Sequence, residues 1–231
     1  MAVAKGSGGR GPSRYRKRRP LPAVAAFVVL CVAATVVWVT VVRTSTPGQA
    51  ASCPAPSSST ARAAMGQPLA PNALDRTAPM APAAIKLQVL NGATQRGQAA
   101  IVTATLQQDG FAHVAAPGND TIFDPAKGHD YLDCRAQIRF GPNGASAART
   151  MSVVEPCAQL VRDDRQDTSV NLVIGTQFDQ LIVRPAARNA LAAIERAAGT
   201  LPTEHGGQSS IQDAAVKVPA AMLNKARAVH C

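Results

Sequence analysis

Residues 87–111, LQVLNGATQRGQAAIVTATLQQDGF, change their hydrophobic period at one short turn. Before the turn, Ile85, Leu87 and Val89 alternate with polar residues, which is typical of a strand with one buried face. After the turn, residues recur at helical spacing, and we expect these on one helical face: Ala99, Ile101, Val102, Thr105 and Leu106. Asp109-Gly110 ends the pattern. The stretch therefore predicts a strand, a glycine turn and a helix.

Strand and helix patterns continue to alternate after this stretch. We expect further strands at 111–115, 136–140 and 170–174, helices at 145–154 and 185–198, and a last helical stretch from Ser210, where Ser210 and Asp213 fit a capping box. Such alternation favours an α/β fold, here a small α/β sandwich with helices packed on a layered sheet.

The turn itself does not match a nucleotide-binding loop. Gly92 and Gly97 have the glycine spacing of a phosphate loop, but Gln98-Ala99 replaces its lysine and hydroxyl residue. The glycines do not fit a dinucleotide fingerprint either. Backbone amides at the helix start, with Arg96 nearby, still offer a contact for an anion. The interpretation we favour is a turn that needs the conformational freedom of glycine.

The basic charge of the chain is concentrated at its N-terminus. The formal net charge is +10 at pH 7, but no acidic residue precedes residue 20, whereas seven cations do: Lys5, Arg10, Arg14, Arg16, Lys17, Arg18 and Arg19. Because the rest of the chain is close to neutral, we expect a tail and no nucleic-acid partner. We interpret the tail as a determinant of membrane topology; a contact with anionic lipid or nucleic acid is the alternative.

A run of uncharged residues, 23–42, follows the basic tail at 1–22. As a helix it would be about 30 Å long, which is the thickness of a bilayer's hydrocarbon core. The run predicts a single transmembrane helix through the plasma membrane. The basic residues before it predict a cytoplasmic N-terminus and an extracytoplasmic chain after Thr44. The alternative is a cleaved secretory signal, whose apolar region usually has only about 7–15 residues.

Residues 43–84 are rich in Ala, Pro, Ser and Thr and contain seven prolines. Few of their side chains are suited to fill a core, so we expect an extended, semi-rigid spacer. The folded part would then be an α/β domain at 85–178, followed by a helical C-terminal extension at 179–231 that Cys231 closes.

Four of the five cysteines lie outside the predicted membrane helix, in a compartment that tolerates disulfides. If the helix at 145–154 folds back along the preceding strand, the two paths, about 23 and 18 Å long, bring Cys134 near Cys157. We therefore predict a Cys134–Cys157 disulfide, which leaves Cys53 to pair with Cys231. Free or intermolecular thiols are the alternative.

Ionisable residues form no motif with catalytic or metal-binding spacing. The histidines are scattered along the chain: His113, His129, His205 and His230. Three acids near residue 165 are interleaved with arginines and are interpreted as a solvated loop: Asp163, Asp164 and Asp167. His129 and Asp130 lie near Cys134, but a disulfide-bonded cysteine is not a nucleophile. We therefore predict no catalytic residue, metal or cofactor, and no enzyme.

The order of these motifs resembles the LytR C-terminal domain (LytR_C) family over about residues 85–178. The motifs that carry the resemblance are Leu90-Asn91-Gly92, Gly97, Ala99, Leu106, Gly110-Phe111, then QIRFG at 137–141 and VNLVIGTQF at 170–178. Gln177 stands where the family usually has Asp. The catalytic domain that often precedes this module in LytR-CpsA-Psr enzymes has no room between the predicted span and the module. The resemblance therefore implies a non-enzymatic protein of the cell envelope.

We expect a membrane-anchored protein whose external domain binds other envelope proteins, LytR-CpsA-Psr enzymes among them, or a cell-wall glycan or lipid. The residues expected on the contact surface are Gly92, Arg96, Gly97 and Arg139. The alternative is an accessory subunit that binds a lipid-linked phosphorylated glycan for a LytR-CpsA-Psr-type ligase. The distinguishing feature of that role would be an apolar cleft flanked by arginine, for which Arg96, Arg139 and Arg149 are the available cations.

Overall fold

The computed structural model describes residues 21–44, 52–124, 127–199, 216–229 and 231. The chain divides into two units, Met1–Thr46 and Pro47–Cys231. In the first unit, helix α1 (Leu21–Thr44) contains the predicted span at 23–42. Among the residues that the structure describes, no helix is both long and apolar enough to cross a membrane.

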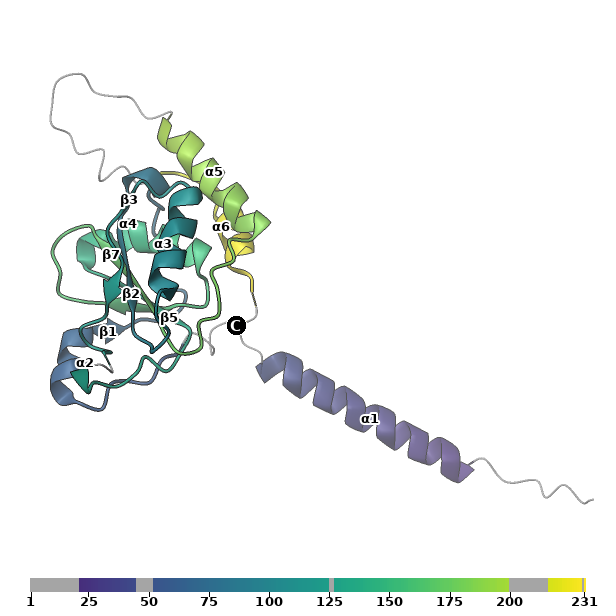
Figure 1. Cartoon of the computed structure of the whole chain (residues 1–231). Coiled ribbons are helices and arrows are strands. Elements are labelled where there is room, and N and C mark those ends of the chain that lie inside the picture. The colour runs from purple at the N-terminus through teal and green to yellow at the C-terminus, as the bar shows by residue number, and fades with distance from the viewer. Residues whose placement is uncertain (1–20, 45–51, 125–126, 200–215, 230) are drawn as a thin grey trace, which may run out of the picture. The chain divides into compact units, whose positions relative to one another are not determined.

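The second unit is built around one mixed β-sheet (Figure 1). Its strands are β1 (Gln67–Pro68), β2 (Lys86–Asn91), β3 (His113–Val114), β4 (Gly118–Asn119), β5 (Ala136–Phe140), β6 (Gln159–Arg162) and β7 (Val170–Ile174). In the described part of the chain their order is β1-β6-β5-β7-β2-β3, and β4 also pairs with β2. Strand β2 runs parallel to β7, and β5 runs antiparallel to β7. The carboxyl ends of β2 and β7 therefore lie at the same sheet edge as the start of β5.

Helices pack on both faces of this sheet. They are α2 (Ser59–Met65), α3 (Gln98–Gln108), α4 (Ala145–Val154), α5 (Pro185–Gly199) and α6 (Ala220–Arg227), with 3₁₀ turns η1 (Pro82–Ala84) and η3 (Pro142–Gly144). The strands predicted at 136–140 and 170–174 and the helix at 145–154 are confirmed. The helix predicted at 185–198 ends one residue later. The predicted helix start and capping box at Ser210 lie outside the described residues.

One sheet face, here called the helix face, holds the main hydrophobic core under α3, α4, α5 and α6. Leu87 of β2, Ile138 of β5 and Leu172 of β7 point into it and are almost fully buried. Figure 1 shows α5 and α6 against each other at one border of this layer. Ile101 is 70% exposed, contrary to prediction. The reason is that Ala99, Val102 and Leu106 already form the inward stripe, and Ile101 lies about 100° away from Val102.

The opposite face, here called the polar face, carries Gln137 and Arg139 of β5 and Gln159 of β6, all buried. It is covered by α2 and by residues 117–124 and 127–134. A small apolar cluster completes this layer: Met65, Phe123, Leu132, Cys134, Val161 and Val173. Successive residues of β5 are therefore buried in two different layers, one on each face of the sheet.

The segment expected to be an extended spacer is largely part of the folded unit. Strand β1 pairs with β6, and Leu74 and Met80 are buried in the main core. The backbone of Met80 also exchanges hydrogen bonds with the hydroxyl of Thr150. A proline-rich chain can dock without regular structure when a few apolar residues are well placed, and composition did not reveal this.

The four cysteines outside α1 are all disulfide-bonded, but the predicted pairing is wrong. The bonds join Cys53 to Cys134 and Cys157 to Cys231. The lengths of β5 and α4 do match, yet Cys134 packs into the cluster on the polar face, whereas Cys157 follows α4, which covers the helix face. The sheet thus separates the two cysteines. Each disulfide instead fastens one of the segments that flank the central domain.

Candidate functional site

A cleft of about 630 Å³ lies at the carboxyl end of β2, beside the first turn of α3. One wall is the turn from Asn91 to Ala100, and the other is formed by Pro117–Asn119 with Asp124 and Tyr131. In open α/β sheets, ligands bind outside the carboxyl ends of the strands. This cleft is therefore our candidate site.

The turn that forms the first wall is shaped by Asn91 and two glycines. The Asn91 side chain accepts a hydrogen bond from the Ala93 backbone at 3.0 Å and donates one to the Gln95 carbonyl at 2.9 Å. Gly97 precedes α3 with φ of +80°, in the left-handed region that glycine adopts without strain. A Cβ on Gly92 would lie 3.0 Å from the Cβ of Leu132. Gly97 thus provides the left-handed conformation of the turn, whereas Gly92 leaves space for the tight packing of Leu132.

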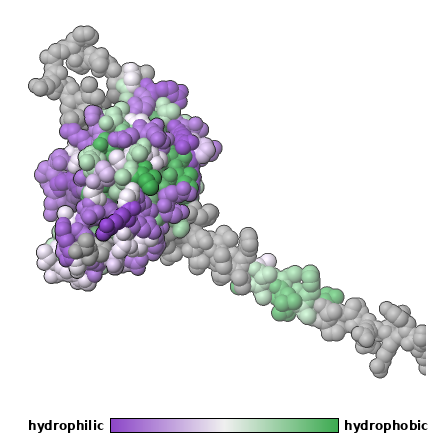
Figure 2. Space-filling model, in the orientation of Figure 1, coloured by the Kyte–Doolittle hydropathy of each residue, from purple (hydrophilic) through white to green (hydrophobic). Residues whose placement is uncertain are grey.

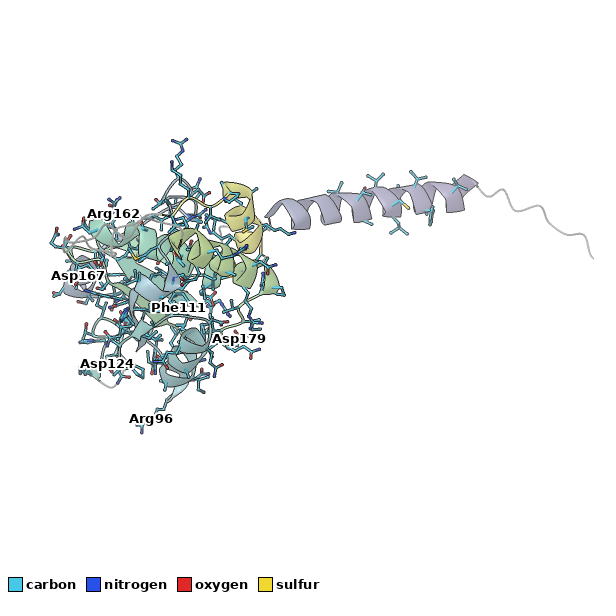
Figure 3. The ribbon with its side chains drawn as sticks, turned by 90° about the horizontal axis from the view of Figure 1, so that it is seen from above. Arg96, Phe111, Asp124, Arg162, Asp167 and Asp179 are labelled. Carbon is cyan, nitrogen blue, oxygen red and sulfur yellow. A yellow bond between two sulfur atoms is a disulfide. The ribbon has the colours of Figure 1, made fainter. Side chains whose placement is uncertain are left out.

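Arg96 is the cation at the mouth of the cleft. Its side chain is exposed and makes no hydrogen bond or ion pair with any described residue. Figure 3 shows Arg96 extending outward from the domain. No acidic residue lies in the first turn of α3, and its N-cap, Gly97, has no side chain to cap the free amides. The cleft mouth is therefore electropositive on this side.

The second wall adds groups that sequence analysis did not single out. Tyr131 is 48% exposed and borders the cleft, and Asp124 is buried with an ion pair of 3.3 Å to Lys127. Asn119 comes from β4, which pairs in parallel with the end of β2. These residues fall in a polar, turn-rich stretch without periodicity. Among these residues only Tyr131 could have been singled out from the sequence, because tyrosine is common at binding surfaces.

Arg139, which we expected on the contact surface, does not line the cleft. Its guanidinium lies on the polar face and bonds both carboxylate oxygens of Asp120 at 2.9 and 3.1 Å. It also donates to Gln137 and lies 5.5 Å from the ring centre of Phe123. Because Asp120 follows Asn119 directly, this buried pair fastens the second wall to the sheet.

The other residues expected at the site also differ in whether they line the cleft. Arg96 and Gly97 line the cleft, whereas Gly92 is buried and does not line it. Arg149 has a fully buried side chain on α4 and pairs with Asp75 at 3.0 Å. Arg149 therefore lies on the helix face and Arg139 on the polar face. The three arginines available for the phosphorylated-glycan role do not converge on one cleft.

A second cleft, of about 540 Å³, lies where α4 ends, next to the Cys157–Cys231 disulfide. Its central cation, Arg135, is already paired: it bonds Glu155 at 3.0 Å and Asp179 at 2.5 Å and lies 5.0 Å from the Phe178 ring centre. Burial opposes the charge of Arg135, but these two carboxylates outweigh burial and raise the pKa of the guanidinium. The same hydrogen bond lowers the pKa of Asp179. The guanidinium of Arg135 is thus used in contacts within the protein, and we do not take this cleft as the candidate site.

The first cleft offers hydrogen-bonding groups, one aromatic ring and a free cation. Within the described residues, no group of three or more His, Cys, Asp or Glu side chains is placed to hold a metal ion. The carboxylates Asp163 and Asp167, considered as a cation site, bond Arg165 and Ser169 instead. Cys134, considered as a thiol, is disulfide-bonded. The arrangement is suited to binding.

Comparisons with known proteins show which family the chain resembles. The LytR_C family, described as "LytR cell envelope-related transcriptional attenuator", matches residues 84–178. The chain is 37% identical over 172 residues to "Cell envelope integrity protein Cei" of Mycobacterium tuberculosis, covering 72% of this chain and 76% of that protein. The resemblance found from the motifs is confirmed.

A solved structure resembles the fold. It is the crystal structure of the soluble domain of a conserved hypothetical secreted protein from Mycobacterium marinum. The TM-score is 0.57 and the identity is 28%, over 72% of this chain and 99% of the other. This similarity extends beyond the 95-residue family match in the flanking segments, which agrees with their packing on the sheet.

Proposed function

The chain belongs to the LytR_C family, and from that membership we propose that it is a non-enzymatic, membrane-anchored protein whose external domain supports cell envelope integrity. In this proposal the domain binds another envelope protein, LytR-CpsA-Psr enzymes among them, or a cell-wall polymer or lipid. The observation that carries the proposal is the 37% identity to a cell envelope integrity protein over most of both chains.

Anchoring through residues 23–42 is supported by the surface of α1. Its described side chains, at 24 and 26–36, are exposed and uncharged, with Phe27 at 67% and Leu30 at 68%. Figure 2 shows this part of α1 as an apolar surface. Alkaline carbonate should leave the protein in the membrane pellet. An impermeant amine reagent on whole cells should modify the exposed Lys86 and Lys127 but neither Lys5 nor Lys17. Release into the supernatant would contradict the anchor.

The contact surface we propose is the cleft at the end of β2. Support comes from its position at the carboxyl edge of the sheet, the free guanidinium of Arg96 and the half-exposed ring of Tyr131. A binding role rather than catalysis is supported by the disulfide-bonded cysteines and by the turn geometry, in which Gly97 sets the backbone conformation and Gly92 leaves space for packing.

The alternative is an accessory subunit that binds a lipid-linked phosphorylated glycan. Arg96 and the uncapped start of α3 favour a phosphate in the cleft. The burial of Arg139 and Arg149 in separate ion pairs opposes it, because neither guanidinium reaches the cleft. We therefore rank it second.

The proposal is tested in a deletion strain challenged with detergent and cell-wall antibiotics. Wild type should restore resistance, whereas Arg96→Glu and Tyr131→Ala should not. Arg162→Glu is the matched control, since Arg162 is also exposed and makes no ion pair with a described residue but lies at the end of β6, away from the cleft. A deletion strain with unchanged resistance would overturn the envelope role, and full rescue by Arg96→Glu and Tyr131→Ala would overturn the cleft.

The two partner classes are separated by purifying the intact protein from cells after gentle solubilisation. Co-purification of LytR-CpsA-Psr enzymes in wild type but not in Arg96→Glu would favour the protein partner. Co-purification of polyprenyl phosphate or glycolipid with the same dependence would favour the alternative.

A further inference from the structure

Two arginines from different segments meet beneath the C-terminal helix and share one carboxylate. Arg149 of α4 and Arg227 at the end of α6 both donate to Oδ1 of Asp75. Arg227 also donates to the Pro71 carbonyl, and Arg149 reaches the side-chain oxygen of Asn224 at 3.5 Å. No other described carboxylate makes an ion pair with either guanidinium. The cluster therefore carries one excess positive charge.

That charge lies in a poorly solvated place. The Arg149 side chain is 0% exposed and that of Arg227 is 14% exposed, whereas Asp75 is 40% exposed. The Nε–H groups of Arg149 and Arg227 are both buried and have no hydrogen-bond partner in the described structure. Buried charges and buried donors are costly unless they are paired. Two unsatisfied donors and one uncompensated charge thus occur in the same cluster.

Electrostatics within the cluster agree with this imbalance. Burial lowers the pKa of Arg149, the charge of Arg227 lowers it further, and Asp75 offsets these effects only in part. A cavity of about 280 Å³ adjoins the cluster and is lined by Asp75, Asn224 and Arg227. There is therefore room for a small ligand beside the excess charge.

We propose that Arg227 and Asn224 bind a small oxyanion, a carboxylate or phosphoryl group, in the cavity at the seam between α6 and residues 71–75. The buried Arg149, which shares Asp75 with Arg227, contributes the excess positive charge. Guanidinium groups match both kinds of oxyanion through paired N–H donors. The bound anion supplies the missing negative charge and accepts from Arg227, while Asn224 donates through its side-chain amide. The site is separate from the cleft at the end of β2 and does not depend on the function proposed there.

The site is tested by thermal unfolding of the full-length protein in nonionic detergent. Inorganic phosphate is titrated at constant ionic strength, with KCl as the balancing salt. A ligand that binds only the native state raises the unfolding midpoint as its concentration rises. We expect such a rise, and a flat response to both phosphate and acetate would overturn the site. The same titration with acetate distinguishes the two ligand groups. A larger rise of the unfolding midpoint with acetate indicates a carboxylate, and a larger rise with phosphate indicates a phosphoryl group.

Two variants should change the phosphate-induced shift of the unfolding midpoint in opposite directions, and a third is the control. Asp75→Asn increases the excess charge, so the phosphate-induced shift should become larger. Arg227→Gln neutralises the cluster, so the shift should be lost. Arg76→Gln is the matched control, because Arg76 is exposed, adjacent and without a described partner, and it should respond like wild type. Equal loss in Arg76→Gln, or a smaller shift in Asp75→Asn, would show general surface attraction and overturn the proposal.

A measurement on the unsubstituted protein covers the case in which a variant fails to fold. The arginine Nε–H signals are followed by NMR in protein labelled with ¹⁵N while phosphate is added. The signals of Arg149 and Arg227 should shift in a saturable way, whereas that of Arg76 should not. Unshifted Arg149 and Arg227 signals would exclude a bound anion at this seam.

Discussion

The two faces of the sheet are stabilised by different interactions. The helix face buries mainly apolar side chains under α3 to α6, whereas the polar face buries Arg139, Asp120, Gln137 and Gln159 in one hydrogen-bonded network. Removing an atom from an apolar core costs only the contacts of that atom. Removing one member of a buried polar network costs more stability, because its partners stay buried and unpaired. The cleft wall depends on the second, less tolerant kind of interaction.

Breaking the Arg139–Asp120 pair should have the largest effect. Asp120→Ala leaves a guanidinium that is 4% exposed without its carboxylate, and should lower the free energy of unfolding by about 3–5 kcal/mol. Urea unfolding measures this. Replacing both members, as in Asp120→Leu with Arg139→Met, should recover much of the loss, because no unpaired charge remains buried. A loss below about 1 kcal/mol in Asp120→Ala would mean that water solvates this network.

Truncation on the helix face should cost somewhat less. Leu106→Ala removes a side chain that is 0% exposed and should cost about 2–5 kcal/mol. Ile101→Ala, on the same helix but 70% exposed, is the control and should stay within about 0.5 kcal/mol of wild type. Similar losses in both variants would place Ile101 in a contact with another molecule.

The helix face could be predicted from sequence because its elements have a clear period. Alternation at 136–140 and 170–174 and helical spacing at 145–154 gave the right elements, since each must bury one side. Ile101 was misplaced because α3 is covered on one side only, and that side is already formed by Ala99, Val102 and Leu106. Strand β6 was missed because it is short and closely follows Pro156.

The polar face and the flanking segments could not be predicted in the same way. Arg139 reads as a surface cation in a sequence, and only the fold brings it to Asp120 of the segment 117–134. The disulfide pairing depended on which sheet face each cysteine occupies, a fact that path lengths alone do not contain. Of the cleft, the turn with Arg96 and Gly97 was foreseen, whereas Asn119, Asp124 and Tyr131 come from an aperiodic stretch.

Gly92 lies where the cleft turn meets the polar face, and its substitution tests how tightly the two are packed. In Gly92→Ala the new Cβ would lie 3.0 Å from Leu132 and 3.3 Å from the Ile174 carbonyl. Crowding of this kind should cost about 1–3 kcal/mol. Gly97→Ala is a useful partner, because there the space is open and only the positive φ opposes the new side chain. A smaller loss in Gly92→Ala than in Gly97→Ala would mean that Leu132 moves freely.

The smallest expected effect concerns the exposed hydrogen bonds between Ser57 and Asp130. Ser57 donates to Asp130 through its hydroxyl and its backbone, which lowers the pKa of Asp130 below the ordinary 3.8. A lowered pKa stabilises the fold above 3.8, and this contribution disappears as pH falls through the folded-state pKa. Asp130→Asn should therefore lower the unfolding midpoint slightly at pH 7 and match wild type at strongly acidic pH. A difference that grows on acidification would contradict the assigned sign.

The claim that the cleft is the contact surface is tested most directly by photocrosslinking in living cells. A photoreactive amino acid replaces Tyr131 in the cleft or, as control, Asp164, which is exposed near the opposite sheet edge. We expect a discrete crosslinked envelope protein, glycan or lipid from position 131 that is lost in Arg96→Glu and absent from position 164. Identical products from both positions, or none from position 131 in a complementing protein, would contradict it.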